Sequence, residues 1–190
     1  MIFKHEDEFT KGRNKICPYD YLWHARDEQS SEKEVGEFMF GLIKLIKPAI
    51  VIETGCYNGD TTLEIGRALR ENKFGKLISC DINQELVDLV NTRLRVLGLT
   101  DTARAVCMTG VELVKTFKDE IDFAFIDSGG GKGVREEEIN ELLKYIKPLK
   151  MFAMHDTAPH KGHISQVADG VDLPKVYFNC PRGLTLFMKK

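Results

Sequence analysis

The sequence predicts an α/β fold whose sheet is doubly wound, mostly parallel, and closed by an antiparallel C-terminal hairpin. Two observations predict it. Between residues 49 and 154, short and continuously apolar runs alternate with segments of helical periodicity, which is typical of parallel strands covered by helices on both faces. After residue 175, two apolar runs are joined by the short link Asn179–Gly183. Strands joined so tightly must run antiparallel.

The first helix of this fold is predicted just after residue 30. Ser31 and Glu34 form the S-x-x-E pattern of a capping box, apolar residues follow at helical spacing to position 46, and Pro48 ends the segment. The later elements are expected in this order: strand 49–52, a helix opened by Thr61-x-x-Glu64, strand 77–80, helix 83–98, strand 105–107, helix 111–118, strand 123–126, helix 134–146 stopped by Pro148, strand 151–154, and strands 176–178 and 184–187.

The chain length fits one domain with a short extension. The 190 residues divide at about position 30. Residues 1–30 have no clear period and are rich in charged residues and in aromatic ones, Tyr19, Tyr21 and Trp23. We interpret them as an N-terminal extension or lid segment, and residues 31–190 as the main domain.

Composition and charge favour a protein that binds small molecules. Hydrophobic residues make up 43% and charged residues 29%, and the formal net charge is −2. Basic residues are interspersed with acidic ones, so we expect no nucleic-acid partner. No apolar run is long enough to span a bilayer, so we expect no membrane partner. The five scattered cysteines and the absence of a signal peptide lead us to expect a cytoplasmic protein.

A glycine turn and an acid after the next strand predict an adenosine-containing ligand. Residues 53–62 read E-T-G-C-Y-N-G-D-T-T where the first strand turns into a helix. The spacing is G-x-x-x-G, unlike the G-x-G-x-x-G that binds pyrophosphate, and alone it also fits a simple chain reversal. Asp81 follows Gly59 by 22 residues, where a carboxylate accepts hydrogen bonds from ribose hydroxyls. The alternative for Asp81 is a charge at a helix N-terminus.

Residues 31–190 resemble class I methyltransferases that use S-adenosylmethionine (SAM), in particular the small-molecule O-methyltransferases. Three stretches carry the resemblance: residues 31–59, with L-I-K-P, a strand and E-x-G-x-x-x-G-x-[ST]; I-D-F-A-F-I-D at 121–127; and M-H-D-T at 154–157. The hairpin fits the antiparallel seventh strand of that Rossmann-like fold. The resemblance implies SAM-dependent methyl transfer to a small-molecule acceptor, with oxygen the expected acceptor atom.

The resemblance also implies a set of cofactor-binding residues. Glu53, Gly55 and Tyr57 would line the methionine part of SAM, Thr61 or Thr62 would bind its carboxylate, and Asp81 its ribose. Thr109, Gly110 and Val111 would lie beside the adenine. The full implied set is Glu53, Gly55, Tyr57, Asn58, Gly59, Thr61, Thr62, Asp81, Ile82, Thr109, Gly110, Val111 and Asp127.

Asp127, His155 and Asp156 are the candidate catalytic residues. They follow the fourth and fifth strands, where catalytic groups collect in open α/β sheets. Relatives in the O-methyltransferase group hold a divalent cation with an Asp, Asp, Asn-like set, whereas this chain has Asp127, His155 and Asp156. Two alternatives stay open: a metal site for a cation such as Mg²⁺, or a side-chain base.

Two rival functions also stay open at this stage. One is a nicotinamide-dependent oxidoreductase on a Rossmann-like fold, which the G-x-x-x-G spacing and the antiparallel tail disfavour. The other is a non-catalytic SAM-binding module, which the intact glycines and acids disfavour. The identity of the acceptor is not readable from the sequence, and a homodimer is left open.

Overall fold

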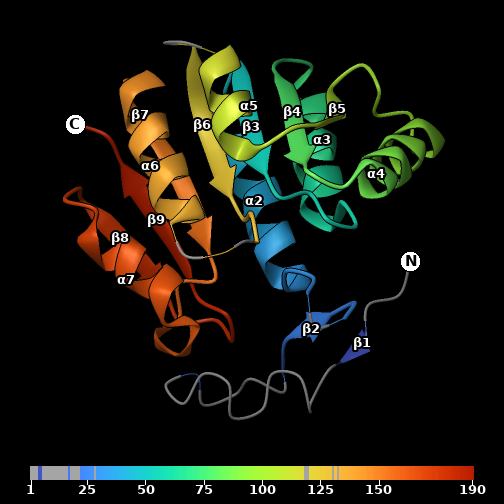
Figure 1. Cartoon of the computed structure of the whole chain (residues 1–190). Coiled ribbons are helices and arrows are strands. Elements are labelled where there is room, and N and C mark those ends of the chain that lie inside the picture. Colours follow the sequence, from blue (N-terminus) through green and yellow to red (C-terminus); the bar gives the residue numbers. More distant parts are fainter. Residues whose placement is uncertain are drawn as a thin grey trace.

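The computed structural model describes residues 4–5, 17, 22–27, 29–117, 120–129, 131 and 133–190. Its centre is a seven-stranded sheet in the order β5-β4-β3-β6-β7-β9-β8, drawn in Figure 1. The strands are β3 (Ile50–Thr54), β4 (Lys76–Asp81), β5 (Ala103–Cys107), β6 (Ile121–Ile126), β7 (Ile146–His155), β8 (Lys175–Phe178) and β9 (Leu184–Met188). The strands from β5 to β7 pair in parallel, and β9 pairs antiparallel with both β7 and β8. The predicted fold class is therefore confirmed.

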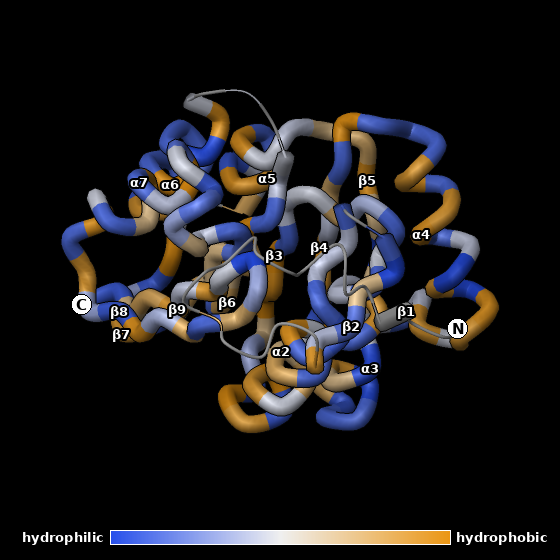
Figure 2. The backbone as a smooth tube through the Cα atoms, turned by 90° about the horizontal axis from the view of Figure 1, so that it is seen from below, coloured by the Kyte–Doolittle hydropathy of each residue, from blue (hydrophilic) through white to orange (hydrophobic). Residues whose placement is uncertain are grey.

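Helices cover both faces of the sheet. They are α2 (Lys33–Ile46), α3 (Asp60–Asn72), α4 (Gln84–Val96), α5 (Gly110–Thr116), α6 (Val134–Tyr145) and α7 (His163–Gly170). Side chains of α2, α3 and α4 form one core cluster with Val51 and Phe125, while those of α5, α6 and α7 form the other with Ile52 and Ala124. Neighbouring strand residues thus point to opposite cores, as the period of two requires. Figure 2 shows the hydrophobic stretch along β3 between these layers.

The order of the strands creates a crevice at their carboxyl ends. The chain leaves β3 toward β4 and β5 on one side, while β6 and β7 lie on the other. Residues Thr54 of β3 and Ile126 of β6 are paired neighbours at this point. Crossovers that diverge from adjacent parallel strands leave a crevice where ligands bind in open α/β sheets.

The predicted capping box of the first helix is wrong. The N-cap of α2 is Glu32, whose side chain makes no capping bond. The hydroxyl of Ser31 instead donates to Asp127, and the carboxylate of Glu34 accepts from the backbone N–H of His24. Ser31 and Glu34 bind these distant groups and do not cap the helix, because Asp127 and the His24 N–H are partly buried polar groups that need hydrogen-bond partners.

Further boundaries also differ from prediction. Helix α3 begins at Asp60 with Gly59 as N-cap, one residue before Thr61. Helix α6 ends at Tyr145, one residue before the predicted end, whereas strand β7 begins at Ile146, so the predicted strand start at 151 is wrong. The pairing of β6 with β7 shifts register between Ile121 and Phe123, and this irregularity accommodates a proline that has no N–H for the ladder.

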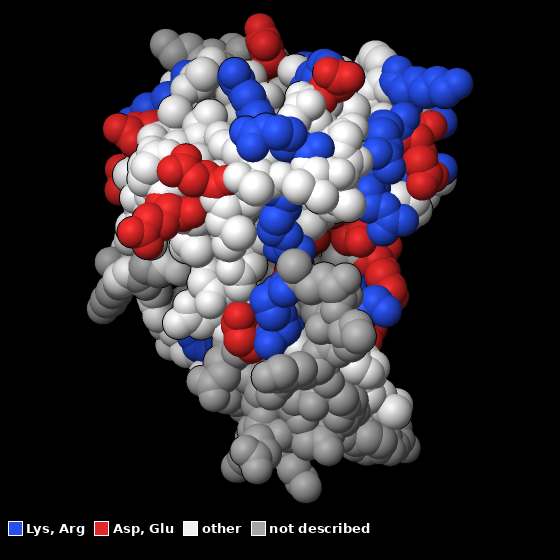
Figure 3. All heavy atoms as spheres, turned by 90° about the vertical axis from the view of Figure 1, so that its right-hand side faces the viewer, with Lys and Arg blue, Asp and Glu red and all other residues white. Residues whose placement is uncertain are grey.

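The N-terminal segment contributes a small antiparallel pair, β1 (Lys4–His5) with β2 (His24–Ala25). Tyr19 and Tyr21 lie outside the described residues, and Trp23 packs against the core cluster that α2, α3 and α4 share. Among the helices that the structure describes, none combines the length and the apolar character needed to cross a membrane. On the face seen in Figure 3, basic and acidic side chains are interspersed, as the sequence predicts.

Asp122 connects the starts of three strands, β3, β6 and β7, through hydrogen bonds and an ion pair. Its Oδ2 accepts from the backbone N–H groups of Ala49 and Ile50, each at 3.0 Å, and its Oδ1 lies 3.0 Å from Lys147 Nζ. Burial alone would raise the pKa of Asp122, but the Ile50 N–H and Lys147 outweigh burial and lower it. The stabilisation is thus fully present above the unfolded-state pKa and is lost as the pH falls through the lower folded-state pKa.

We expect Asp122→Asn to lower the free energy of unfolding at pH 7 by about 1–3 kcal/mol, because charged hydrogen bonds are lost. The difference from the wild type should shrink below about pH 4, where the unfolded-state carboxyl begins to protonate. Urea denaturation at pH 7 and at pH 3 measures both values. An equal difference at the two pH values would contradict this role of the charge.

Candidate active site

A cavity of about 570 Å³ opens at the crevice between β3 and β6. This volume is in the range of small-molecule sites. Of the residues predicted to bind a cofactor or to act in catalysis, nine line it: Glu53, Gly55, Tyr57, Asn58, Thr61, Asp81, Ile82, Asp127 and Asp156. Gln29, Ser30 and Ser31 of the N-terminal segment and Arg182 of the hairpin also line it. The cavity therefore joins residues from the whole length of the chain.

The glycine turn after β3 forms one wall of the cavity. Gly55 has a φ of +80°, and a Cβ atom there would lie 2.5 Å from the carbonyl oxygen of Asp127. Gly59 also has a φ of +80°, and a Cβ atom would lie 2.8 Å from Val90. Both positions thus require glycine for backbone conformation and for close packing. The turn brings the end of β3 against the end of β6.

Glu53, which lies in β3 just before this turn, is a buried carboxylate with 1% exposure. Its Oε2 accepts hydrogen bonds from Thr62 Oγ1 at 2.5 Å and Ser79 Oγ at 2.6 Å. Burial raises the pKa of Glu53 to about 7, and the negative charges of Asp127 and Asp81 add to the rise. A positively charged ligand group beside Glu53 would offset this cost. Thr62 itself uses its hydroxyl on Glu53 and does not line the cavity.

Asp81 lies at the end of β4, beside the glycine turn. Its Oδ2 accepts from the backbone N–H of Tyr57 at 3.1 Å, and its Oδ1 from that of Asn83 at 3.0 Å. Asn83 in turn caps α4, as predicted. Beside it Ile82 is 78% exposed, so an apolar surface adjoins the carboxylate. A carboxylate beside an apolar wall suits a ribose linked to a flat base.

Thr109, Gly110 and Val111 are not among the cavity-lining residues. Thr109 closes a capping box with Glu112 at the start of α5. The position of a Cβ atom at Gly110 is taken by the carboxylate of Glu138. Among the residues that follow Asp81, Ile82, Asn83 and Leu86 line the cavity.

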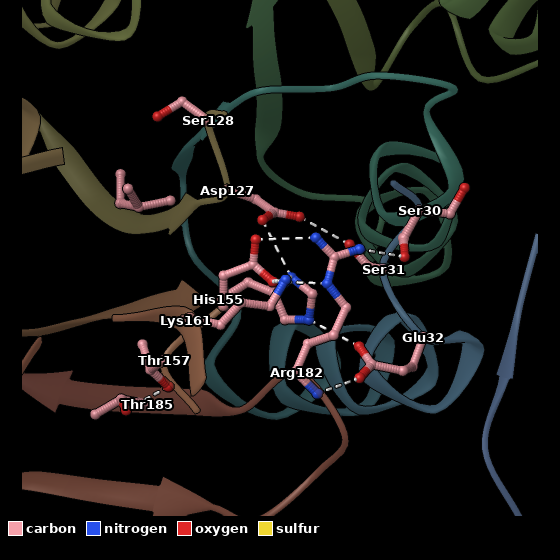
Figure 4. A network of polar contacts seen from close by, with 12 residues as sticks. Ser30, Ser31, Glu32, Asp127, Ser128, His155, Thr157, Lys161, Arg182 and Thr185 are labelled. Atoms are coloured by element: carbon pink, nitrogen blue, oxygen red, sulfur yellow. Dashed lines mark hydrogen bonds and ion pairs between the residues drawn. The ribbon is translucent and has the colours of Figure 1, made fainter. Parts of the chain in front are cut away.

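A network of charged side chains closes the other end of the cavity, and Figure 4 shows its centre. We call it the charged cluster; its members are Glu32, Asp127, Arg135, His155, Asp156, Lys161 and Arg182. Three of them are carboxylates and four are basic. They come from the start of α2, the ends of β6 and β7, helix α6, the loop after β7, and the link before β9.

His155 is the centre of the cluster and is completely buried. Its Nδ1 lies 3.1 Å from Asp127 Oδ1, and its Nε2 lies 2.8 Å from Glu32 Oε2. Burial opposes the charge of the ring, but Asp127 and Glu32 outweigh burial and raise the pKa of His155 to about 9. An imidazole between two carboxylates satisfies both by donating from both nitrogens.

Asp156 is held by two cations. Arg182 donates from Nε to Asp156 Oδ1 at 2.6 Å and from Nη2 to Oδ2 at 2.9 Å, and Lys161 Nζ lies 2.9 Å from Oδ1. Burial would raise the pKa of Asp156, but the charges of His155 and Arg182 lower it far below its usual value. A bidentate arginine pair fixes the plane of the carboxylate as well as its charge.

Asp127 connects the cluster to the cavity. Its Oδ2 accepts from Ser31 Oγ at 2.8 Å, while its Oδ1 contacts His155 and also Arg135 Nη2, the latter at 3.4 Å. Burial would raise the pKa of Asp127, but His155 outweighs it and lowers the value. The carboxylate therefore stays ionised at neutral pH and presents fixed negative charge to the cavity.

Asp127, His155 and Asp156 lie close enough for one cation, with candidate ligand atoms within 4.8 Å of one another. Their existing partners decide against Mg²⁺, which takes mainly oxygen ligands. Both carboxylates already bind basic side chains, and the ring between them holds its nitrogens toward Asp127 and Glu32. A divalent ion would also face Arg135, Lys161 and Arg182. The three residues thus do not fit a hard divalent cation.

The sequence reasoning missed Glu32, Arg135, Lys161 and Arg182, and it read Ser31 only as a helix cap. Glu32 Oε1 accepts from the backbone N–H of Arg182 at 2.8 Å, so two segments 150 residues apart meet there. Arg182 stands in the link N-C-P-R-G. A basic residue in a tight hairpin link was the one available signal, and it did not reveal the partner.

A methyltransferase-domain family model matches residues 52–157, which is more than half of the chain. The chain belongs to this methyltransferase family. The match runs from β3 to the residue after Asp156, so it includes the glycine turn, Asp81, Asp127 and His155.

Two curated methyltransferases are similar in sequence. A putative caffeoyl-CoA O-methyltransferase of Arabidopsis thaliana is 28% identical over 148 residues, covering 74% of this chain and 62% of that protein. An O-methyltransferase of Aspergillus hancockii is 24% identical over 107 residues, covering 56% of this chain and 40% of that protein. The chain thus spans less than two thirds of the length of either relative.

The fold is shared with solved methyltransferases. The crystal structure of the Podospora anserina methyltransferase PaMTH1, bound to S-adenosylhomocysteine (SAH), superposes with a TM-score of 0.74 at 14% identity. The superposition covers 100% of this chain and 89% of that one. At this identity the similarity establishes the fold, seven strands with an antiparallel end.

We expect millimolar Mg²⁺ to leave the melting temperature unchanged, because the charged cluster already neutralises its carboxylates. A ligand that binds only the folded state would raise the melting temperature through mass action. Differential scanning calorimetry with Mg²⁺ and with a chelator measures the effect. A rise that disappears in Asp127→Asn would contradict this assignment and restore a metal site.

Proposed function

We propose that this methyltransferase uses SAM to methylate an oxygen atom of a small-molecule acceptor. The observation that carries the proposal is that two acids, Glu53 and Asp81, line one cavity together with the glycine turn. Both curated relatives are named as O-methyltransferases, and PaMTH1 holds SAH. SAM supplies an activated methyl group, so the protein needs mainly to align it with the acceptor.

We assign the residues that line the cavity to two halves, one that would bind SAM and one that would bind the acceptor. Asp81 would accept hydrogen bonds from the ribose hydroxyls, with Ile82 and Leu86 against the adenine. Glu53 would face the positively charged methionine part, and Thr61 would bind its carboxylate. These assignments fit the burial of Glu53. Burial raises the pKa of this carboxyl, and a cation beside it would favour its ionised form. The acceptor would then lie between this half and Asp127.

The charged cluster would orient the acceptor. Asp127 is the cluster member that is tied to both Ser31 and His155 and also borders the cavity. His155 would hold Asp127 in place and Asp156 would hold Arg182 at the wall. Because no carboxylate here lacks a donor partner, the cluster can keep its geometry while the acceptor enters.

The N-terminal segment would act as a lid over the acceptor. Gln29 and Ser30 line the cavity. Arg26 donates to both carboxylate oxygens of Asp60 at the start of α3, and Asp27 accepts from the side-chain amide of Asn58 at 3.2 Å. These contacts join the segment to the glycine turn, so closing it would exclude water from the cavity.

Asp81→Ala should weaken SAM binding by about 1–3 kcal/mol, because hydrogen bonds to a charged group are lost. Isothermal titration calorimetry with SAM, SAH and NAD measures the affinities. Asp88→Ala, which removes an exposed aspartate of α4 outside the cavity, is the matched control and should bind SAM as the wild type does. Tight binding of NAD, or unchanged SAM affinity in Asp81→Ala, would refute the assignment of the cavity.

A further inference from the structure

We propose that Arg135 is a positioning residue for methyl transfer, which sets the places of the two cluster acids that line the cavity, Asp127 and Asp156. The inference rests on the proposed function, which directs the methyl group of SAM toward Asp127. Arg135 is not among the residues that line the cavity, and it is only 3% exposed. It therefore acts through the groups that it binds and not by touching substrate or cofactor.

The guanidinium of Arg135 binds the backbone at the ends of β6 and β7. Its Nη1 donates to the carbonyl oxygen of Ile126 at 2.8 Å and to that of His155 at 3.3 Å. These two residues directly precede Asp127 and Asp156 in the chain. One guanidinium nitrogen of helix α6 thus holds the peptide unit that leads into each of the two acids.

Two further contacts of Arg135 hold the turn that follows β6. Its Nε donates to the carbonyl oxygen of Ser128 at 2.6 Å, and its Nη2 lies 3.4 Å from Asp127 Oδ1. The backbone N–H of Asp127 donates to the carbonyl oxygen of Thr54, at the end of β3, at 2.9 Å. In Figure 4 the side chain of Asp127 points toward His155, whereas that of Ser128 points away. Arg135 thus holds the chain on both sides of Asp127.

Both acids lie in backbone that leaves little room for displacement. Asp156 has a φ of +64°, in the left-handed region that is unfavourable for a residue with a side chain. The carbonyl oxygen of Asp127 lies so close to Gly55 that a Cβ atom there would be 2.5 Å away. A shift of the ends of β6 and β7 would move both carboxylates relative to the glycine turn. Methyl transfer from SAM depends on alignment, so such a shift would slow it.

A lysine at position 135 would keep the positive charge without keeping these contacts. The guanidinium is planar and its donors point in fixed directions, whereas an ammonium group is a compact point charge. Three nitrogens of Arg135 bind three carbonyl oxygens and one carboxylate. Arg135→Lys therefore separates positioning of the acids from simple neutralisation of Asp127.

The test compares SAH with sinefungin, a SAM analogue in which a carbon bearing a protonated amine replaces the sulfur and its methyl group. A carboxylate held beside the methyl position attracts this amine, and SAH has no charge there. Isothermal titration calorimetry at pH 7 should show that the wild type binds sinefungin at least about tenfold more tightly than SAH. Asp127→Asn should remove most of this preference, because it removes the charge.

In Arg135→Lys the preference for sinefungin should fall at least about fivefold, while the SAH affinity stays within about twofold of the wild type. Adding Arg135→Lys to Asp127→Asn should cause no further loss of preference, because the effect of Arg135 passes through that carboxylate. Arg67→Lys is the matched control. Arg67 is partly exposed on α3, pairs with Glu64 and does not line the cavity, so this variant should behave as the wild type does.

A wild type that binds the two ligands equally, a preference unchanged in Arg135→Lys, or losses that add in the double variant would overturn the inference. It would also be overturned if Arg135→Lys failed to fold or to bind SAH, because Arg135 would then serve the fold as a whole. Failure of the wild type to bind SAH would overturn the proposed function together with it.

Discussion

The contact on which the site depends is that of His155 with Glu32 and Asp127. One buried imidazole joins the start of α2, the end of β7 and the end of β6. If either carboxylate were removed, the other charges would remain buried without compensation, which typically costs several kcal/mol. The same ring keeps Asp127 ionised and fixed at the cavity. These two contacts thus couple the start of α2 to the position of Asp127 at the cavity.

Arg182 extends this network to the C-terminal hairpin. Its side chain binds Asp156 and the carbonyl oxygen of Ser30, while its backbone N–H binds Glu32. Gly183 beside it has a φ of +81°, and a Cβ atom there would clash with the backbone of Ala158. The link before the antiparallel strand β9 therefore places the guanidinium of Arg182 at the cavity wall.

The parts that sequence predicts well are those that local chemistry determines. Strands β3, β4 and β6 read as apolar runs because both their faces are buried, and the glycine turn, Asp81 and Asn83 occupy strand ends that the sequence marks. The cluster could not be predicted so fully. Glu32, Arg135 and Arg182 are recruited by pairing across the fold, so no spacing reveals them. Ser31 shows the same limit, since its local pattern fits a cap while its partner is Asp127, 96 residues away.

A crystal structure with SAH bound would show directly how the cofactor lies in this cavity. We expect the ribose against Asp81, the amino group beside Glu53, and the sulfur directed toward Asp127, with Lys161 and Arg182 still on Asp156. SAH bound outside this cavity, a sulfur that points away from the charged cluster, or a divalent ion in place of the basic side chains between Asp127 and Asp156 would contradict the proposed site.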